Sequence, residues 1–259
     1  KDSERVSFRV STLPTYYGEK TVMRLLRETT SGFTLEGLGF HGEDLEKLHH
    51  ALNQSTGMLL ATGPTGSGKT TTLYTMLDIL NTPDVNIITI EDPIEYQMKR
   101  VNQTQVKPEI GLTFGSGLRS LVRQDPDIIM VGEIRDSETV GLAINAALTG
   151  HLVLSTLHTN SAAGAIPRLL DMGAEAFLLV STINVIIAQR LVRKVCQSCI
   201  SSYAITPEIQ KIILDQLKEL ALDPEKVMLQ KHFYKGSGCL SCGGTGYKGR
   251  LGIFEVLEK

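Results

Sequence analysis

The stretch GPTGSGKTT, residues 63–71, follows the apolar run MLLAT (58–62) and precedes a helical pattern. It contains the spacing GxxxxGK[ST]. The glycines allow the backbone to turn tightly, so that successive N–H groups point at one anion. A helix that begins there adds the partial positive charge of its N-terminus. A strand before the pattern and a helix after it are the context that the pattern requires. The sequence therefore predicts a loop that binds nucleotide phosphates.

Within this loop, Lys69 is expected to reach the β- and γ-phosphates, and the hydroxyl of Thr70 to bind Mg²⁺. A chance match is the alternative, since about one chain in a hundred of this length would contain the pattern at average composition. The predicted nucleotide-binding residues are Gly63, Pro64, Thr65, Gly66, Ser67, Gly68, Lys69, Thr70 and Thr71.

The composition is that of an ordinary globular protein, with 42% hydrophobic and 21% charged residues. The net charge of −2 gives no support for nonspecific binding to nucleic acid or to anionic lipid. The most apolar segment, 176–188, is interrupted by polar residues and is shorter than the roughly 18 residues of a membrane span. The chain opens without a starting Met or a signal-peptide pattern, and we expect a fragment of a longer protein.

Short apolar runs alternate with helical patterns along most of the chain. Unbroken apolar strands between helices are typical of a parallel sheet covered on both faces, so we predict an α/β fold. Pro167 is expected to break or kink a helix over 161–172. An amphipathic helix is predicted over 206–222. The other predicted strands are 86–90, 127–131 and 151–156, and the other predicted helices are 42–54, 69–80, 117–124 and 137–148.

Two acidic residues and a histidine each follow one of these strands. Glu91 directly follows 86–90, Glu133 lies two residues after 127–131, and His158 lies two residues after 151–156. Because the carboxyl ends of parallel strands share one edge of a sheet, these side chains are expected beside the phosphate loop. There, carboxylates can orient water or a metal, and an imidazole can approach the γ-phosphate. Glu133 is favoured over Glu91 as the base, and the sequence leaves the choice open. A solvated charge at a strand end is the alternative for each residue. His151 lies seven residues before His158, and for it a structural role is at least as well supported as a role at the site.

Four motifs in order resemble the Walker A, Asp box, Walker B and His box of the bacterial secretion ATPases. They are GPTGSGKTTTLY (63–74), TIEDPIEY (89–96), LRSLVRQDPDIIMVGEIRD (118–136) and TGHLVLSTLHTNSA (149–162). The resemblance extends over essentially all 259 residues. It implies a RecA-like core in a homo-hexameric ring that hydrolyses ATP with Mg²⁺. It also implies a cytoplasmic location, peripheral at the inner membrane, where the ring drives a membrane-embedded platform protein and works with other cytoplasmic components.

The resemblance also assigns four arginines. Arg9 and Arg24 match arginines of the family's N-terminal domain that approach the phosphates, and Arg119 and Arg123 match those just before Walker B. A guanidinium suits developing phosphate charge, and a surface or interface ion pair is the alternative. The predicted domains are 1–30, the end of the second N-terminal domain; 31–190, the ATPase core; and 191–259, a metal-binding subdomain with the C-terminal tail.

Four cysteines form two CxxC pairs, at Cys196 and Cys199 and at Cys239 and Cys242. Four thiolates can close a tetrahedral Zn²⁺ site, whose role would be structural because no coordination position stays open. Disulfides or free buried thiols are the alternatives, and disulfides are uncommon in cytosolic proteins. The second pair also fits a chaperone zinc repeat, but that unit occurs once here. Within the secretion ATPases, this element resembles the pilus-assembly and type II secretion branches, whereas pilus-retraction ATPases lack it.

Three functions are compatible with these features. The first is a type IV pilus assembly motor, slightly favoured, and the second is the type II secretion motor. The third is a P-loop nucleotide switch with little turnover, against which the catalytic equipment at Glu91, Glu133 and His158 argues. A DNA-translocating RecA-like protein is a weaker fourth hypothesis, and no nucleic-acid partner is expected because aromatic residues make up 5% of the chain and the charge is nearly balanced.

Overall fold

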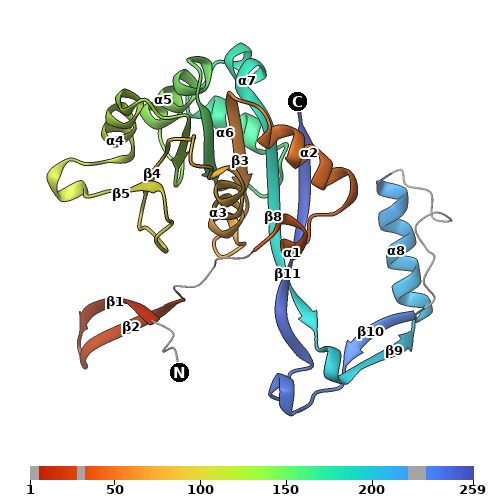
Figure 1. The fold of residues 1–259 in the computed structure, drawn as a ribbon. Coiled ribbons are helices and arrows are strands. Elements are labelled where there is room, and N and C mark those ends of the chain that lie inside the picture. Colours follow the sequence, from red (N-terminus) through yellow and green to blue (C-terminus); the bar gives the residue numbers. More distant parts are fainter. Residues whose placement is uncertain (1–5, 28–32, 221–231) are drawn as a thin grey trace. The chain divides into compact units, whose positions relative to one another are not determined.

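The computed structural model describes residues 6–27, 33–220 and 232–259. Contacts divide the chain into two compact units. The first contains residues 1–190 and 252–259, and the second contains residues 191–251 (Figure 1). None of the helices in the described ranges is long and apolar enough to cross a membrane.

The first unit is built on one large sheet. Seven strands lie in the order β11-β8-β3-β7-β6-β4-β5, with β8 and β11 reaching into the second unit (Figure 1). The pairings of β3 with β7 and β8, of β6 with β7 and β4, and of β4 with β5 are parallel. These strands are β3 Gly57–Thr62, β4 Ile87–Glu91, β5 Val101–Gln105, β6 Ile128–Val131, β7 Leu152–Leu157, β8 Ile183–Val195 and β11 Tyr247–Glu258. The predicted parallel sheet is confirmed.

Helices cover both faces of this sheet because its central strands are apolar on both sides. One core cluster joins the sheet to α4 Phe114–Leu121, α5 Ser137–Leu148, α6 Ala165–Asp171 and α7 Ala176–Thr182. The other joins the opposite face to α1 Leu35–Leu38, α2 Gly42–Leu52 and α3 Lys69–Leu80. All residues of β3 and β7 are buried, so the central strands lie in the core.

The last strand, β11, lies next to β8 at one edge of the large sheet. The N–H of Lys259 donates to the carbonyl of Asn184 near the start of β8, and the N–H of Cys196 donates to Gly246 just before β11. These two bonds pair opposite ends of the strands, so β11 runs antiparallel to β8. The ring of Phe254 stacks on Phe40 at a centroid distance of 3.6 Å.

The expectation for Pro167 is wrong. This residue is the third of α6 Ala165–Asp171, and the helix continues without a break from it to Asp171. The physical reason is position. Pro167 falls in the first turn, where the backbone N–H has no partner within the helix, so the missing donor costs nothing.

A β-hairpin forms the N-terminal described segment. Strand β1 Val6–Thr15 pairs antiparallel with β2 Gly18–Arg27, and Gly18 has φ +115° beyond the turn. Arg9 and Arg24 are register partners in this hairpin. Their side chains lie outside the described part of the chain.

The second unit is small. It contains the hairpin of β9 Ile200–Ala204 with β10 His232–Gly236, and helix α8 Pro207–Glu219. The predicted helix over 206–222 is thus confirmed over Pro207–Glu219, and its last two predicted residues, 221 and 222, lie outside the described residues.

Candidate nucleotide site

The phosphate loop joins β3 to α3 at the carboxyl edge of the sheet. Gly63, Gly66 and Gly68 have φ of +142°, +78° and +93°, in the left-handed region that favours glycine. Gly68 is the N-cap of α3, so Lys69 opens the helix as the motif predicts. Pro64, Thr65, Gly66 and Thr70 are exposed, which leaves the outer surface of the loop open to a ligand.

Lys69 folds back over the loop. Its Nζ donates to the carbonyl oxygens of Gly63 at 2.9 Å and Pro64 at 3.2 Å, and the residue is 8% exposed. Burial lowers the pKa of this ammonium, and the charge of Glu133 opposes the shift. The ammonium is therefore held by weak neutral acceptors, which phosphate oxygens can replace.

Glu133, Arg135 and His158 form a cluster next to this lysine. One carboxylate oxygen of Glu133 lies 2.6 Å from Nη2 of Arg135, and the other lies 3.3 Å from Nε2 of His158. Glu133 is 8% exposed, whereas the side chains of Arg135 and His158 are about half exposed or more. The structure thus brings together three of the sequence-predicted site residues, Lys69, Glu133 and His158, from three separate segments.

Glu91 lies in a different environment. It is 2% exposed, and its carboxylate accepts hydrogen bonds from the Thr89 hydroxyl, the Tyr74 hydroxyl and, at 3.1 Å, Nε2 of Gln103. Burial raises the pKa of Glu91, while these donors act in the opposite direction. The same burial raises the pKa of Tyr74. Glu91 is therefore a buried carboxyl group whose oxygens already accept hydrogen bonds from three donors.

Two further residues hold the loops of the site, and the sequence analysis missed both. Thr62 Oγ1 is 2.7 Å from Thr159 Oγ1 and accepts from the N–H of Thr159, which ties the phosphate loop to the segment after His158. Gln189 of β8 donates from Nε2 to the carbonyl of Ser67 at 2.8 Å. The available signal was a polar residue in an apolar strand, in MLLAT for Thr62 and in NVIIAQ for Gln189.

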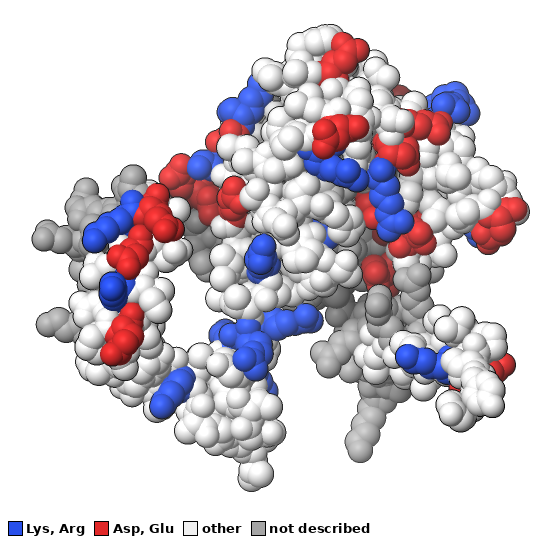
Figure 2. All heavy atoms as spheres, turned by 180° about the vertical axis from the view of Figure 1, so that it is seen from behind, with Lys and Arg blue, Asp and Glu red and all other residues white. Residues whose placement is uncertain are grey.

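The remaining predicted residues lie apart from this cluster. Arg119 Nη2 donates to Oε1 of Glu138 at 2.8 Å, and Arg123 donates to the carbonyl of Arg119. His151 precedes β7, and its Nδ1 lies 2.9 Å from the carbonyl of Ala146 in α5, which is a structural contact. In Figure 2, acidic and basic side chains are interspersed over the face shown.

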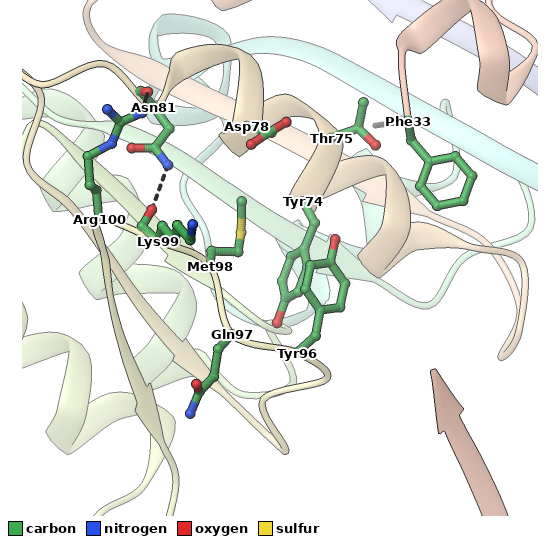
Figure 3. A pocket seen from close by; sticks show the side chains of 10 residues that line it. All are labelled: Phe33, Tyr74, Thr75, Asp78, Asn81, Tyr96, Gln97, Met98, Lys99 and Arg100. Atoms are coloured by element: carbon green, nitrogen blue, oxygen red, sulfur yellow. Dashed lines mark hydrogen bonds between the residues drawn. The ribbon is translucent and has the colours of Figure 1, made fainter. Parts of the chain in front are cut away.

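A cavity of about 620 Å³ lies along α3, beyond the phosphate loop. Figure 3 shows Tyr74 and Tyr96 side by side at its wall, where their rings make an edge-to-face contact with centroids 4.4 Å apart. The segment from Tyr96 to Arg100 forms another wall, where Nδ2 of Asn81 donates to the carbonyl of Lys99. Tyr74 is also bonded to Glu91, so one side chain separates this cavity from the buried carboxyl group.

The four cysteines form a second candidate site, in the second unit. Their Sγ atoms all lie within 4.8 Å of one another, and the recorded separations are 3.7 and 3.9 Å. A disulfide would bring two sulfurs to about 2.05 Å. Zn–S bonds of about 2.3 Å in a tetrahedron place sulfurs about 3.8 Å apart. The arrangement therefore fits a four-coordinate metal.

Backbone donors assist this cluster. The Cys242 thiol accepts from the N–H groups of Cys239 at 3.2 Å and Gly246 at 3.3 Å. These bonds, the one from Cys239 foremost, lower the pKa of Cys242 to about 6. Desolvation raises the pKa of Cys199 to about 11. The cluster thus already stabilises one thiolate, the form that binds a metal.

A strand–loop–helix phosphate site on a parallel sheet, with acidic residues and a histidine at neighbouring strand ends, defines a P-loop nucleotide-binding protein with a RecA-like core. A family model described as type II/IV secretion system protein matches residues 2–259, and the chain belongs to this family.

Named relatives and a solved structure agree with this membership. The chain is 54% identical over 254 residues to the type II secretion system protein E of Xanthomonas campestris, covering 98% of this chain and 43% of that protein. It is 50% identical over 252 residues to the type IV pilus assembly ATPase PilB of Thermus thermophilus, covering 97% of this chain and 27% of that protein. It is similar to the pilus retraction motor PilT with bound ADP, with a TM-score of 0.64, 35% identity and coverage of 86% and 67%. The chain thus spans less than half the length of these two curated relatives.

Proposed function

We propose that this chain is the ATP-hydrolysing core of a motor for protein secretion or pilus assembly. The observation that carries the proposal is the convergence of Lys69, Glu133 and His158 at the edge of the sheet that also carries the phosphate loop. A switch that only binds nucleotide needs the loop, but it does not need a carboxylate and an imidazole placed beside it. Relatives named as ATPases support the same conclusion.

Each part of the site has a chemical task in this proposal. The N–H groups of 63–71 hold the phosphates, and Lys69 exchanges its two carbonyl partners for phosphate oxygens. Mg²⁺ would be held by the exposed hydroxyl of Thr70 and would neutralise phosphate charge. Glu133 takes the proton of the attacking water or orients that water, and His158, bonded to Glu133, fixes its direction.

Glu133 suits the role of base better than Glu91. The partners of Glu133 are exposed, so water can reach its carboxylate when they move. The carboxylate of Glu91 is enclosed by three donors from Tyr74, Thr89 and Gln103. We assign Glu91 the second role, in which it fixes α3 and the segment after β4 at the site.

The four arginines belong to the proposal as charge-stabilising groups. Arg119 and Arg123 would act on bound nucleotide once Arg119 leaves Glu138, because that ion pair is exposed on both sides. Arg9 and Arg24 would act from the N-terminal hairpin, whose backbone register places them opposite one another.

The assembly is the part of the proposal that rests on relatives. We propose a homo-hexamer that is cytoplasmic and peripheral at the inner membrane, and that acts on a platform protein there. Type IV pilus assembly is our first choice and type II secretion the second. Relatives of both names match at about 50% identity, so identity does not separate the two. Zn²⁺ at Cys196, Cys199, Cys239 and Cys242 is proposed as a structural ion, supported by the sulfur separations.

Phosphate release from ATP by the chain tests this proposal, with wild type measured beside Glu133→Gln. We expect turnover in the wild type and a loss of about 100-fold or more in the variant, with MgATP affinity retained. Glu109→Gln, an exposed glutamate in the short turn after β5, is the matched control and should leave turnover unchanged. The mass in solution is measured on the same samples.

The outcomes separate the candidate functions. Turnover that Glu133→Gln removes, in a species near six chains, supports an oligomeric motor. Tight MgATP binding with equal and negligible turnover in all three proteins would support the nucleotide switch instead.

A further inference from the structure

Gln189 is a buried polar residue at the back of the phosphate loop. It lies on β8 directly after Ala188, the register partner of Thr62, which is the last residue before the loop. It is 3% exposed, and the neighbouring residues Val185 to Ala188 are buried and apolar. A buried amide in such a strand must be hydrogen-bonded, and its Nε2 donates to the carbonyl of Ser67 at 2.8 Å.

The backbone of Gln189 also shapes the start of the loop. A Cβ placed on Gly63 would lie 2.4 Å from the carbonyl oxygen of Gln189, so only glycine fits this close approach. One residue of β8 thus touches both Gly63 at the beginning of the loop and Ser67 near its end. Neither contact involves a group proposed to react.

The Ser67 contact fixes the direction of a phosphate donor. In a planar trans peptide, the carbonyl and the following N–H point in opposite directions. Holding the carbonyl of Ser67 toward Gln189 therefore aims the N–H of Gly68, the N-cap of α3, away from β8 and toward the place where the proposed phosphates would bind.

Two polar atoms at this contact have no hydrogen-bond partner among the described residues. They are Oε1 of Gln189 and Oγ of Ser67, and both are buried. The Ser67 hydroxyl can donate, and a phosphate oxygen in the loop is an acceptor that would satisfy it. A loop set in its phosphate-binding shape before the anion arrives accounts for a buried donor of this kind.

We propose that Gln189 is a positioning residue for phosphate binding: by holding the carbonyl of Ser67, it presets the N–H of Gly68 and the hydroxyl of Ser67 toward the bound phosphates. The inference rests on the proposed nucleotide binding and does not depend on which glutamate is the base.

The test is the dissociation constant for MgADP, measured by calorimetry on the chain. Gln189→Met keeps the length of the side chain and removes its donor, and we expect binding to weaken by about tenfold or more, because an oriented N–H to phosphate is a strong hydrogen bond. Gln189→Leu also lacks the donor and carries no group that could replace it, so it should weaken binding to a similar degree. Gln105→Met, at an exposed glutamine of β5, is the matched control and should bind like wild type.

Thermal unfolding without nucleotide accompanies each measurement. Reduced MgADP affinity in both Gln189 variants, with unfolding close to that of wild type, supports the inference. Folded variants that bind as tightly as wild type would overturn it, and so would loss of the fold in both variants, which would make Gln189 purely structural. A wild-type chain that does not bind MgADP would overturn the proposed function itself.

Discussion

The two sites of this chain lie in units that are held together differently. The nucleotide site stands on a sheet whose central strands are wholly buried between two layers of helices. In the described part of the second unit, Cys196 and Leu217 are the buried apolar residues. Small units with so little core usually depend on a metal or on cross-links. The first unit thus shapes its site by packing, whereas the second is expected to depend on the proposed metal at its four cysteines for its fold.

Removing one of the four proposed metal ligands should have the largest effect, and it should separate the two units. Cys242→Ser loses the thiol that the backbone stabilises as thiolate, so we expect loss of the bound metal and of the fold of 191–251. The phosphate loop should keep its structure because its contacts lie within the first unit. Metal content and hydrogen exchange, read separately for 57–62 and for 200–204, measure this.

Ser241→Ala, between Cys239 and Cys242 in the sequence, is the control and should keep the metal. Normal protection of 200–204 in metal-free Cys242→Ser would show that the second unit folds without the ion.

Truncating an apolar side chain should lower the free energy of unfolding by very different amounts in the two units. Leu60 is fully buried in β3, and Leu60→Ala should lower the free energy of unfolding by about 2–5 kcal/mol, since it leaves a cavity. Ile212 of α8 is 63% exposed, and Ile212→Ala should change it by no more than about 0.5 kcal/mol. Urea denaturation measures both. Similar losses in the two variants would mean that α8 is packed against something in solution.

Burial of Glu91 should make the stability of the first unit depend on pH. Its pKa in the folded chain is raised above the ordinary value of 4.5, so the folded state binds its proton more tightly than the unfolded state does. The contribution of Glu91 to the free energy of unfolding is therefore most favourable below pH 4.5, and it is lost as the pH rises through the raised pKa. In the Glu91→Gln variant, the free energy of unfolding should therefore change less with pH over this range.

Urea denaturation of wild type and Glu91→Gln at several pH values above 4.5 measures this difference. Glu109→Gln, at an exposed glutamate in the short turn after β5, controls for a general change of charge. Parallel curves for wild type and Glu91→Gln would show that the three donors keep the carboxyl group ionised.

A small effect on stability is also expected at Arg119. Its ion pair with Glu138 leaves 59% and 51% of the two side chains exposed, so Arg119→Ala should cost less than about 1 kcal/mol of folding free energy. The proposed role at the phosphates predicts reduced ATP turnover in the same variant. Glu138→Ala breaks the same ion pair without touching the arginine, and equal turnover in both variants would leave Arg119 with a surface role.

Local patterns in the sequence were sufficient for most of the fold. The glycine spacing of 63–68 and the lysine after it located the start of α3 at Lys69. The apolar runs located β3, β4, β6 and β7, whereas β5, β8 and β11 of the same sheet were not predicted. The placement of Pro167 failed because the expectation treated the whole of 161–172 as one helix. The helix begins at Ala165, and a proline in a first turn is harmless.

What the sequence by itself determined is the phosphate loop, the parallel sheet and the edge at which Glu133 and His158 meet, because strand direction and local spacing fix these features. Tertiary structure alone decided how the residues differ once they are there. Glu91 and Glu133 follow neighbouring strands, yet donors from α3 and β5 enclose the first, while exposed groups surround the second. Gln189 reaches the phosphate loop from β8, although it lies 122 residues after Ser67 in the sequence. Burial and pairing of this kind depend on which distant segments pack together, and no local pattern contains that information.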